Sequence, residues 1–398
     1  MRYELHLNPA TGPLPALPTG APPGDAGPGA FHRSLPGYRC TPLRDSPELA
    51  RLLGVRAVLV KDEATRLGLP SFKILGASWA TVTAVLRHWI AQPVTPLTLD
   101  RVAAAIPRPR TRRLVAATDG NHGRGVARMA RLLGVAATIL VPAGTAGART
   151  DAIADEGAEV VVVDGSYDDA IAASAALAGP DTLVVSDTSW PGYELIPAAV
   201  VAGYATLFAE IDADIAGRGL PAPTVVALQA GVGAFAAAGI RHFRAPDRPG
   251  PPPRTVVVEP TGANCLMASA RAGRLAEVPG PHRSTMAGLN CGLPSVLAWP
   301  TVRAGADVFL AVDDDAAHRA MTELADAGVV AGESGAAGLA GLLAVARTGD
   351  PGDRTRTGLA PDACVLVVNT EGATDPVNYR RVVGHAPAPL DDTPAGVA

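Results

Sequence analysis

One lysine in this chain has the neighbours that a nucleophilic amine needs. Lys73 lies in the stretch Ser71-Phe72-Lys73-Ile74-Leu75-Gly76-Ala77-Ser78, between an aromatic residue and a face of small residues. An amine needs a lowered pKa to attack a carbonyl, and apolar neighbours lower it by desolvating the ammonium. An arbitrary lysine is usually a surface residue, but Gly76 and Ala77 also leave room here for a flat ring. Lys73 is therefore the candidate nucleophile.

A glycine-rich segment is the second chemical feature. The residues Gln229-Ala230-Gly231-Val232-Gly233-Ala234 follow a predicted strand and open a helix, an arrangement in which backbone N–H groups and the helix dipole converge on phosphate. The candidate phosphate site consists of Gly231, Val232, Gly233 and Ala234. With Glu259 at the end of the next strand, the segment also matches a dinucleotide fingerprint. No Lys-Ser or Lys-Thr follows the glycines, which excludes a Walker-type loop.

A polar turn follows another predicted strand. The residues Thr118-Asp119-Gly120-Asn121-His122-Gly123-Arg124-Gly125 lie between an apolar run at 114–117 and a helix that we expect to start near Val126. They bring an acid, an amide, an imidazole and a guanidinium close to one backbone turn. Ligands of open α/β sheets gather at the carboxyl ends of strands, so this turn is a candidate site, although ordinary turns favour the same residue types.

Other polar residues end predicted strands or begin helices. Asp187 ends one strand and Asn369-Thr370-Glu371-Gly372 ends the last one, so both can face the same crevice. Ser334 precedes a predicted helix, which favours an N-cap role for its hydroxyl. Asp168 and Asp169 lie early in a helix, where we expect them to interact with the helix dipole rather than to catalyse.

The elements that position these residues alternate regularly. Apolar runs at 114–117, 136–141, 159–163 and 182–186 are separated by Ala-rich stretches of helix length, a βαβ pattern with parallel strands. Further strands are expected at 55–60, 224–228, 254–259 and 364–368, and helices after the cap Ser46 and at 73–89, 196–216, 314–327 and 335–347. The Pro- and Arg-containing segment 91–113 looks like a surface connection. At 398 residues, 48% of them hydrophobic, the chain is expected to form two α/β domains.

The composition excludes several classes of partner. The balance of 34 basic against 38 acidic residues gives a net charge of −4, and no long basic run is present to follow a nucleic-acid backbone. We expect no signal peptide and no membrane span, because no apolar stretch looks long enough. The four cysteines lack CxxC spacing and histidine partners, which argues against a metal site. Their scarcity predicts a cytoplasmic protein.

As a set, these motifs resemble the fold type II pyridoxal phosphate enzymes, and within them most closely the diaminopropionate ammonia-lyases. The resemblance spans about residues 50 to 380. The segments that carry it are Ser71-Phe72-Lys73, Thr118 to Gly125, Asp187-Thr188, Gln229 to Gly233, Val258-Glu259-Pro260, Met286-Ala287-Gly288-Leu289, Glu333-Ser334-Gly335-Ala336 and Thr370-Glu371-Gly372.

The resemblance implies two domains, each with a mainly parallel, open twisted sheet flanked by helices. Residues 1–85 and 205–398 would form a large cofactor-binding domain. Within it, the Pro-, Gly- and Ala-rich composition predicts an extended arm at 1–37, and the loss of periodicity predicts a loose tail at 382–398. Residues 86–204 would form a small α/β domain. A homodimer is the expected assembly.

The resemblance also implies a role for each cofactor-binding residue. Lys73 would hold pyridoxal 5'-phosphate as a Schiff base, and the amides of residues 231–234 would bind its phosphate. Asn121 would lie near the phenolic oxygen of the ring and Thr370 near the pyridine nitrogen. A hydroxyl does not hold the ring protonated as an aspartate does, so the electron sink is milder and β-elimination becomes plausible.

The implied reaction converts 2,3-diaminopropionate to pyruvate and two ammonia molecules through an aminoacrylate. The family acts on both enantiomers, which requires bases on opposite faces of the cofactor. Lys73 would act on the L substrate and Asp119 on the D substrate, because a general base must reach the proton it removes. Asp187 would bind the distal amine, and Ser71 and Asp119 complete the substrate-binding set.

Three alternatives remain open at this point. A serine or threonine dehydratase of the same fold would use the same lysine and loop with a hydroxyl leaving group. An NAD-dependent oxidoreductase would rest on the Gly231 loop and Glu259, and a catalytically inactive protein would bind the cofactor without turnover. Cys265 and Cys291 lie in matching stretches, and we hypothesise that they form a gating thiol pair.

Overall fold

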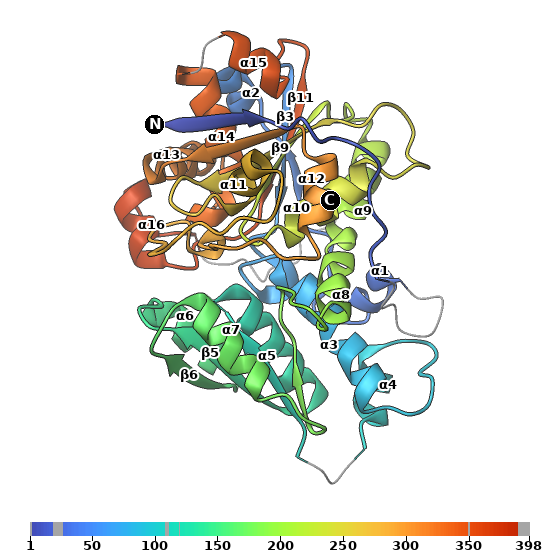
Figure 1. Ribbon diagram of the computed structural model, residues 1–398. Coiled ribbons are helices and arrows are strands. Elements are labelled where there is room, and N and C mark those ends of the chain that lie inside the picture. The colour runs from blue at the N-terminus through green and yellow to red at the C-terminus, as the bar shows by residue number, and fades with distance from the viewer. Residues whose placement is uncertain (1, 19–26, 108–110, 119, 349–350, 389–398) are drawn as a thin grey trace.

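The helices and strands are organised around two separate β-sheets (Figure 1). The computed structural model describes residues 2–18, 27–107, 111–118, 120–348 and 351–388. Both sheets are mainly parallel and carry helices between their strands, which confirms the predicted α/β class. In Figure 1 the smaller sheet, with α5, α6 and α7, lies below the larger one.

Among the described residues, the larger sheet has seven strands, and its antiparallel pairs lie at the two edges, where β1 meets β10 and β2 meets β3. In spatial order its strands are β1 (Tyr3–Leu7), β10 (Val308–Val312), β9 (Arg254–Pro260), β8 (Val225–Gln229), β11 (Cys364–Asn369), β3 (Ala57–Asp62) and β2 (Leu43–Asp45). The smaller sheet is fully parallel, in the order β6 (Glu159–Val163), β5 (Ala136–Pro142), β4 (Arg113–Ala117) and β7 (Thr182–Val184).

The helices connect these strands in the alternation that the sequence predicts. The helices of the first half are α1 (Pro28–His32), α2 (Pro47–Leu53), α3 (Lys73–His88), α4 (Leu99–Ala105), α5 (Asn121–Leu133), α6 (Gly147–Ala154), α7 (Tyr167–Ala176) and α8 (Leu195–Gly203), with the 3-10 helix η1 (Arg66–Gly68). Those of the second half are α9 (Ala205–Arg218), α10 (Ala234–Phe243), α11 (Cys265–Ala272), α12 (Trp299–Gly305), α13 (Asp314–Asp326), α14 (Glu333–Thr348), α15 (Pro351–Thr357) and α16 (Pro376–Val383), with η2 (Ala287–Leu289). All strands of the smaller sheet fall within 86–204, while the domain boundaries themselves stay a prediction.

Three expectations about irregular segments are wrong. The start of the expected arm is the edge strand β1, because Tyr3 and Leu5 alternate with polar residues and pair with β10. The expected connection at 91–113 contains α4, which buries Leu99 and Val102 on one helical face. The predicted tail begins inside α16, and its residues 389–398 lie outside the described part of the chain.

The helix α3, which begins at Lys73, is packed unusually closely. It runs between α8 and α5, and glycines make the close approach of α8 possible. A Cβ on Gly76 would lie 2.6 Å from the ring of Tyr204, and a Cβ on Gly203 would lie 2.5 Å from the carbonyl oxygen of Leu75. Larger residues at these positions would push α3 and α8 apart, so the glycines fix where the helix places Lys73.

One apolar stretch is longer than the sequence analysis allowed. Residues Leu195–Arg218, which comprise α8 and α9, are long and apolar enough to cross a membrane, and 72% of their apolar window is buried inside the protein. The expectation that no stretch reaches such a length is therefore wrong. Since α8 packs against α3, the stretch is a core element of the fold.

A buried network of charges anchors the chain just before Lys73. Glu210 Oε2 lies 2.7 Å from Lys61 Nζ and 2.7 Å from Arg66 Nη2, and Arg66 also pairs with Glu63 at 2.7 Å. Two cations and two anions balance, as buried charges require. Because Arg66 lies in η1, the network fixes the segment that leads into α3.

Replacing Glu210 by glutamine should leave Lys61 and Arg66 with one carboxylate between them. We expect this variant to lose about 3–5 kcal/mol of unfolding free energy at neutral pH, the usual cost of breaking a buried ion pair. Urea unfolding measures it. The exposed pair of Arg271 and Glu4 supplies the control, since Glu4→Gln should change stability by less than about 1 kcal/mol.

The same network should give a defined pH dependence. Burial opposes ionisation of Glu210, but Arg66 and Lys61 lower its pKa from 4.5 to about 2. A lowered folded-state pKa stabilises the fold above the unfolded-state value, and that contribution is lost as the pH falls towards 2. Unfolding free energy should therefore fall from about pH 4.5 to about pH 2 more steeply in the native protein than in Glu210→Gln. Parallel curves would contradict this assignment.

Candidate active site

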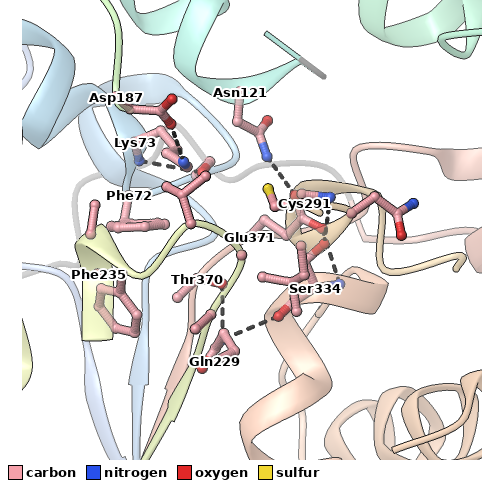
Figure 2. Close-up of a pocket in the computed structure, with 18 of the residues that line it drawn as sticks. Phe72, Lys73, Asn121, Asp187, Gln229, Phe235, Cys291, Ser334, Thr370 and Glu371 are labelled. Atoms are coloured by element: carbon pink, nitrogen blue, oxygen red, sulfur yellow. Dashed lines mark hydrogen bonds and ion pairs between the residues drawn. The ribbon is translucent and has the colours of Figure 1, made fainter. Parts of the chain in front are cut away.

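One pocket collects most of the segments singled out in the sequence (Figure 2). About 700 Å³ of space inside it, part of it open to solvent, is not filled by protein atoms. The predicted site residues that line it are Ser71, Lys73, Asn121, Asp187, Gly231, Val232, Ala234 and Thr370. Gly233 caps the adjoining helix α10, and Asp119 lies outside the described residues.

Lys73 forms an ion pair at the centre of the pocket. Its Nζ donates to Asp187 Oδ2 at 2.6 Å, and the other oxygen of Asp187 accepts from Tyr167 Oη at 3.1 Å. The side chain of Lys73 is 20% exposed and that of Asp187 7%. Because α3 follows a strand of the larger sheet and Asp187 follows β7 of the smaller, the ion pair joins the two sheets (Figure 2).

The ion pair changes the environment that the sequence predicts for Lys73. The predicted aromatic neighbour is present, with the ring centroid of Phe72 5.9 Å from Nζ. Burial favours the protonated form of Asp187, but the charge of Lys73 and the hydrogen bonds from Lys73 and Tyr167 hold the pKa of Asp187 well below its usual range. An adjacent carboxylate stabilises an ammonium, so Asp187 opposes the desolvation by apolar neighbours.

The polar turn differs from its predicted form, because α5 begins at Asn121 and not near Val126. Thr118 Oγ1 accepts from the N–H groups of Gly120 and Gly123 at 2.9 and 3.1 Å. These bonds satisfy amides at the helix start and allow the chain to turn early. Asn121 is thereby the first residue of the helix and lines the pocket.

Asn121 and Ser334 meet at a buried carboxylate. Asn121 Nδ2 donates to Glu371 Oε2, and Glu371 Oε1 accepts from the backbone N–H of Ser334 at 3.2 Å. Burial raises the pKa of Glu371. The predicted N-cap role of Ser334 is wrong, because it lies inside α14 and its hydroxyl accepts from the N–H of Gly288 at 3.1 Å. This bond ties the loop at 288–291, which lines the pocket, to α14.

The glycine loop forms the wall between β8 and α10. Gly233 has a φ of +99°, a left-handed conformation that favours glycine, and it caps α10 without any side-chain bond to the first turn. The first N–H groups of a helix have no intrahelical partner. The loop therefore leaves backbone N–H donors at the N-terminus of α10, where Val232 and Ala234 line the pocket.

Two cysteines flank Gly231. Cys265 Sγ lies 3.7 Å from the carbonyl oxygen of Gly231, and a Cβ on Gly231 would lie 2.9 Å from Cys291 Sγ. Within the described part of the chain, neither cysteine forms a disulfide. The gating pair thus stays a prediction, to be abandoned if the free-thiol count does not change on reduction.

Thr370 is held by a buried glutamine. Its Oγ1 accepts from Gln229 Nε2 at 2.9 Å (Figure 2), and the two residues are 4% and 2% exposed. The other amide atom, Gln229 Oε1, is buried with no partner among the described residues. An acceptor buried in this way costs about 1–3 kcal/mol, so the orientation of this amide is held by its remaining contacts.

The comparisons with known proteins agree with this arrangement. Residues 35–359 match the family model described as pyridoxal-phosphate dependent enzyme. The chain is 40% identical to the diaminopropionate ammonia-lyase of Escherichia coli (strain K12), over 90% of this chain and 92% of that protein. The chain belongs to the diaminopropionate ammonia-lyase family.

Solved structures of this family share the whole fold. The crystal structure of Escherichia coli diaminopropionate ammonia lyase in complex with D-serine has a TM-score of 0.86 at 35% identity, covering 96% of this chain and 97% of that chain. The structure of the same enzyme with an aminoacrylate-PLP azomethine reaction intermediate has a TM-score of 0.83, with the same identity and coverage. Family membership confirms the predicted fold and cofactor class.

The residues of the pocket fit the cofactor of this family. Lys73 supplies an amine for the aldehyde of the cofactor. The loop before α10 supplies N–H donors for its phosphate, and Thr370 supplies a polar partner for its ring nitrogen. The role of each residue stays a prediction, but the chemistry of the donor set matches the three polar ends of pyridoxal phosphate.

Family membership also removes the dinucleotide alternative, and the structure explains the carboxylate that suggested it. Glu259 is fully buried and accepts from the N–H groups of Leu266 and Met267, both at 2.8 Å. It therefore holds the start of α11. Burial raises its pKa to about 8, and its oxygens are occupied by backbone donors.

Tyr167 and Gln229 of the pocket wall have no role that the sequence motifs indicate. Tyr167 begins α7 directly after Ser166, which forms a capping box with Asp169; this confirms the helix-terminal role of Asp169. Gln229 was treated only as part of the glycine motif. Its position, as a polar side chain at the end of an apolar strand, could have indicated a role in the site. No sequence pattern indicates that Tyr167 lies beside Asp187.

A methyl group on Gly231 should disturb the loop. In Gly231→Ala the new Cβ would lie 2.9 Å from Cys291 Sγ and 3.3 Å from the carbonyl oxygen of Gly288, so the two walls of the pocket must separate. We expect at least a tenfold weaker binding of pyridoxal phosphate, measured by absorbance titration. In the control Gly262→Ala, the new Cβ has nothing within 4 Å, and affinity should be unchanged. Equal affinities in both variants would contradict the assigned position of the loop.

Proposed function

We propose that this protein catalyses the α,β-elimination of 2,3-diaminopropionate, which yields pyruvate and two molecules of ammonia. The printed activity of the Escherichia coli relative supports this reaction, as does the aminoacrylate-PLP intermediate in the structure of that enzyme. The observation in this chain that carries the proposal is the ion pair between Lys73 and Asp187, inside a pocket that opens onto the glycine loop.

Four groups of the chain would hold the cofactor. Lys73 would bind its aldehyde carbon, the N–H groups of residues 231–234 its phosphate, and Thr370 its ring nitrogen, with Asn121 near the phenolic oxygen. When bound, pyridoxal phosphate supplies an electron sink for the charge that develops at Cα. The chain has to supply the bases and the groups that orient the substrate.

The proposed proton transfers use one base on each face. Lys73 Nζ would remove the Cα proton of the L substrate, and Asp119 that of the D substrate. Lys73 lies in a wall of the pocket next to Ser71, whose Oγ accepts from the backbone N–H of Lys73 at 3.3 Å. Ser71 thereby fixes the first turn of α3 and presents its side chain to the substrate space.

Asp187 favours a cationic leaving group over a neutral one. Its carboxylate is 7% exposed and is neutralised by the ammonium of Lys73. Once Lys73 is engaged with the cofactor, this carboxylate needs another cation, because a buried charge is stable only when paired. The distal ammonium of diaminopropionate supplies one, whereas the hydroxyl of serine or threonine does not. This is the physical reason to place the dehydratase reaction second.

We also infer that the protein is a cytoplasmic homodimer with no membrane or nucleic-acid partner. The family resemblance supports the dimer. The net charge of −4 and the scarcity of cysteine support the remaining points. The division into a large domain (1–85 and 205–398) and a small domain (86–204) is supported by the strands of the two sheets.

The substrate preference can be tested on Asp187. Asp187→Asn keeps the shape and removes the charge, so kcat/KM for diaminopropionate should fall by about 10–100-fold, the value of one charge-assisted hydrogen bond, while turnover of serine changes less. Pyruvate release measures both substrates. Asp181→Asn is the matched control, because Asp181 forms a 2.6 Å ion pair with Arg112 outside the pocket. An equal loss on diaminopropionate and serine would remove the argument for an ammonium leaving group.

The two-base arrangement makes a second prediction. Lys73→Ala should reduce pyruvate release from both enantiomers by about 10²–10⁴-fold or more, because the cofactor also loses its attachment. Asp119→Asn should abolish activity on D-diaminopropionate alone. If the native protein releases pyruvate from serine or threonine but from neither diaminopropionate enantiomer, the dehydratase alternative replaces the proposal.

A further inference from the structure

The side chain of Gln229 is surrounded by acceptors. It lies at the end of β8, directly before the glycine loop, and lines the pocket (Figure 2). Its Nε2 lies 2.9 Å from Val368 O and 3.1 Å from both Ser334 O and Gly335 O. The fourth neighbour is Thr370 Oγ1, at 2.9 Å.

These contacts decide which way the amide points. A backbone carbonyl can only accept, so the NH₂ group of Gln229 must face the three carbonyls and the carbonyl oxygen must face away. There, Oε1 lies beside Gly338, 3.0 Å from where a Cβ would stand, and has no partner among the described residues. Turning the amide over would place Oε1 against three other oxygens. The orientation is therefore fixed even though it leaves an acceptor unsatisfied.

The fixed amide in turn fixes the hydroxyl of Thr370. An amide NH₂ has no lone pair to offer, so Thr370 Oγ1 accepts from Gln229 and its own hydrogen must point elsewhere. Within the described part of the chain, that hydrogen has no acceptor. Since Thr370 lines the pocket, the hydrogen is directed into the ligand space. Thr370 is thus a donor towards whatever group stands in front of it.

We propose that Gln229 is a positioning residue that commits Thr370 to donate a hydrogen bond to the ring nitrogen of the cofactor. This inference rests on the proposed function, in which pyridoxal phosphate occupies the pocket with its ring nitrogen at Thr370. Because Gln229 takes one lone pair of Thr370 Oγ1, the hydroxyl hydrogen is the group that turns towards the ring nitrogen, and a hydrogen bond donated by it favours an unprotonated ring nitrogen. Gln229 thereby sets the strength of the electron sink without touching the cofactor.

The competing interpretation is that Gln229 only ties β8 to α14 and β11. Both interpretations predict a loss of stability in Gln229→Leu. They differ in what happens at the ring. The amide has two hydrogens for its four nearby acceptors, and without it the carbonyl oxygens compete for the hydrogen of Thr370, which turns away from the pocket. If Gln229 acts through Thr370, Gln229→Leu should have no effect on the ring nitrogen in a variant that lacks the Thr370 hydroxyl. If Gln229 is only structural, its effect should remain in that variant.

The experiment is a double-variant cycle on the holoenzyme with Gln229→Leu, Thr370→Val and the two combined. The readouts are the ¹⁵N resonance of bound pyridoxal phosphate labelled at the ring nitrogen and the pH dependence of cofactor absorbance. We expect Gln229→Leu to shift the resonance by about as much as Thr370→Val, and the combined variant to shift it no further. Thr370→Ser keeps the hydroxyl and should match the native protein.

Each outcome decides the matter. A protonated ring nitrogen in the native holoenzyme, an unchanged resonance in Gln229→Leu, or the same added shift in the Thr370→Val background would overturn the inference while leaving the proposed reaction intact. Failure of the native protein to bind pyridoxal phosphate would overturn the proposed function itself. If Gln229→Leu does not fold, Gln229→Met replaces it, since methionine is of similar length, has no N–H to donate and should shift the resonance in the same direction.

Discussion

The ion pair between Lys73 and Asp187 is the constraint on which the rest of the site depends. Its two residues come from different sheets, so a contact of 2.6 Å requires both sheets to be placed accurately. Close helix packing at Gly76 fixes α3 from one side, and the charge network around Arg66 fixes the chain just before it. A change in either support would alter the distance between the amine and the carboxylate, and with it the electrostatics of the whole pocket.

Local patterns predicted most of the elements, and the misses have physical reasons. The buried strands of both sheets were visible as apolar runs, and Ser46 caps α2 as its position predicts. The early start of α5 depends on the hydroxyl of Thr118, which bonds two amides of the turn. The edge strand β1 depends on a partner about 300 residues away. Hydrogen bonds such as these, made to a side chain in a turn or to a strand far along the chain, produce no periodic pattern of apolar residues in the sequence.

The site was predictable as a set of positions but not as a set of contacts. The sequence grouped Lys73, Asp187 and Thr370 because each lies at the end of a strand or the start of a helix. It could not show that Asp187 pairs with Lys73, or that Glu259 and Glu371 have different structural roles. One of these buried glutamates holds a helix start and the other receives the amide of Asn121. Both are glutamates near the end of a strand of the larger sheet, and their different partners come from packing.

The edge strand β1 has a practical consequence for handling the protein. Its five residues cover one side of β10, whose residues Val308–Val312 are all buried. A truncation that removes residues 3–7 would expose a fully apolar strand edge, the kind of surface that pairs with other chains and aggregates. An affinity tag or cleavage site placed next to this strand therefore lies at the edge of the larger sheet.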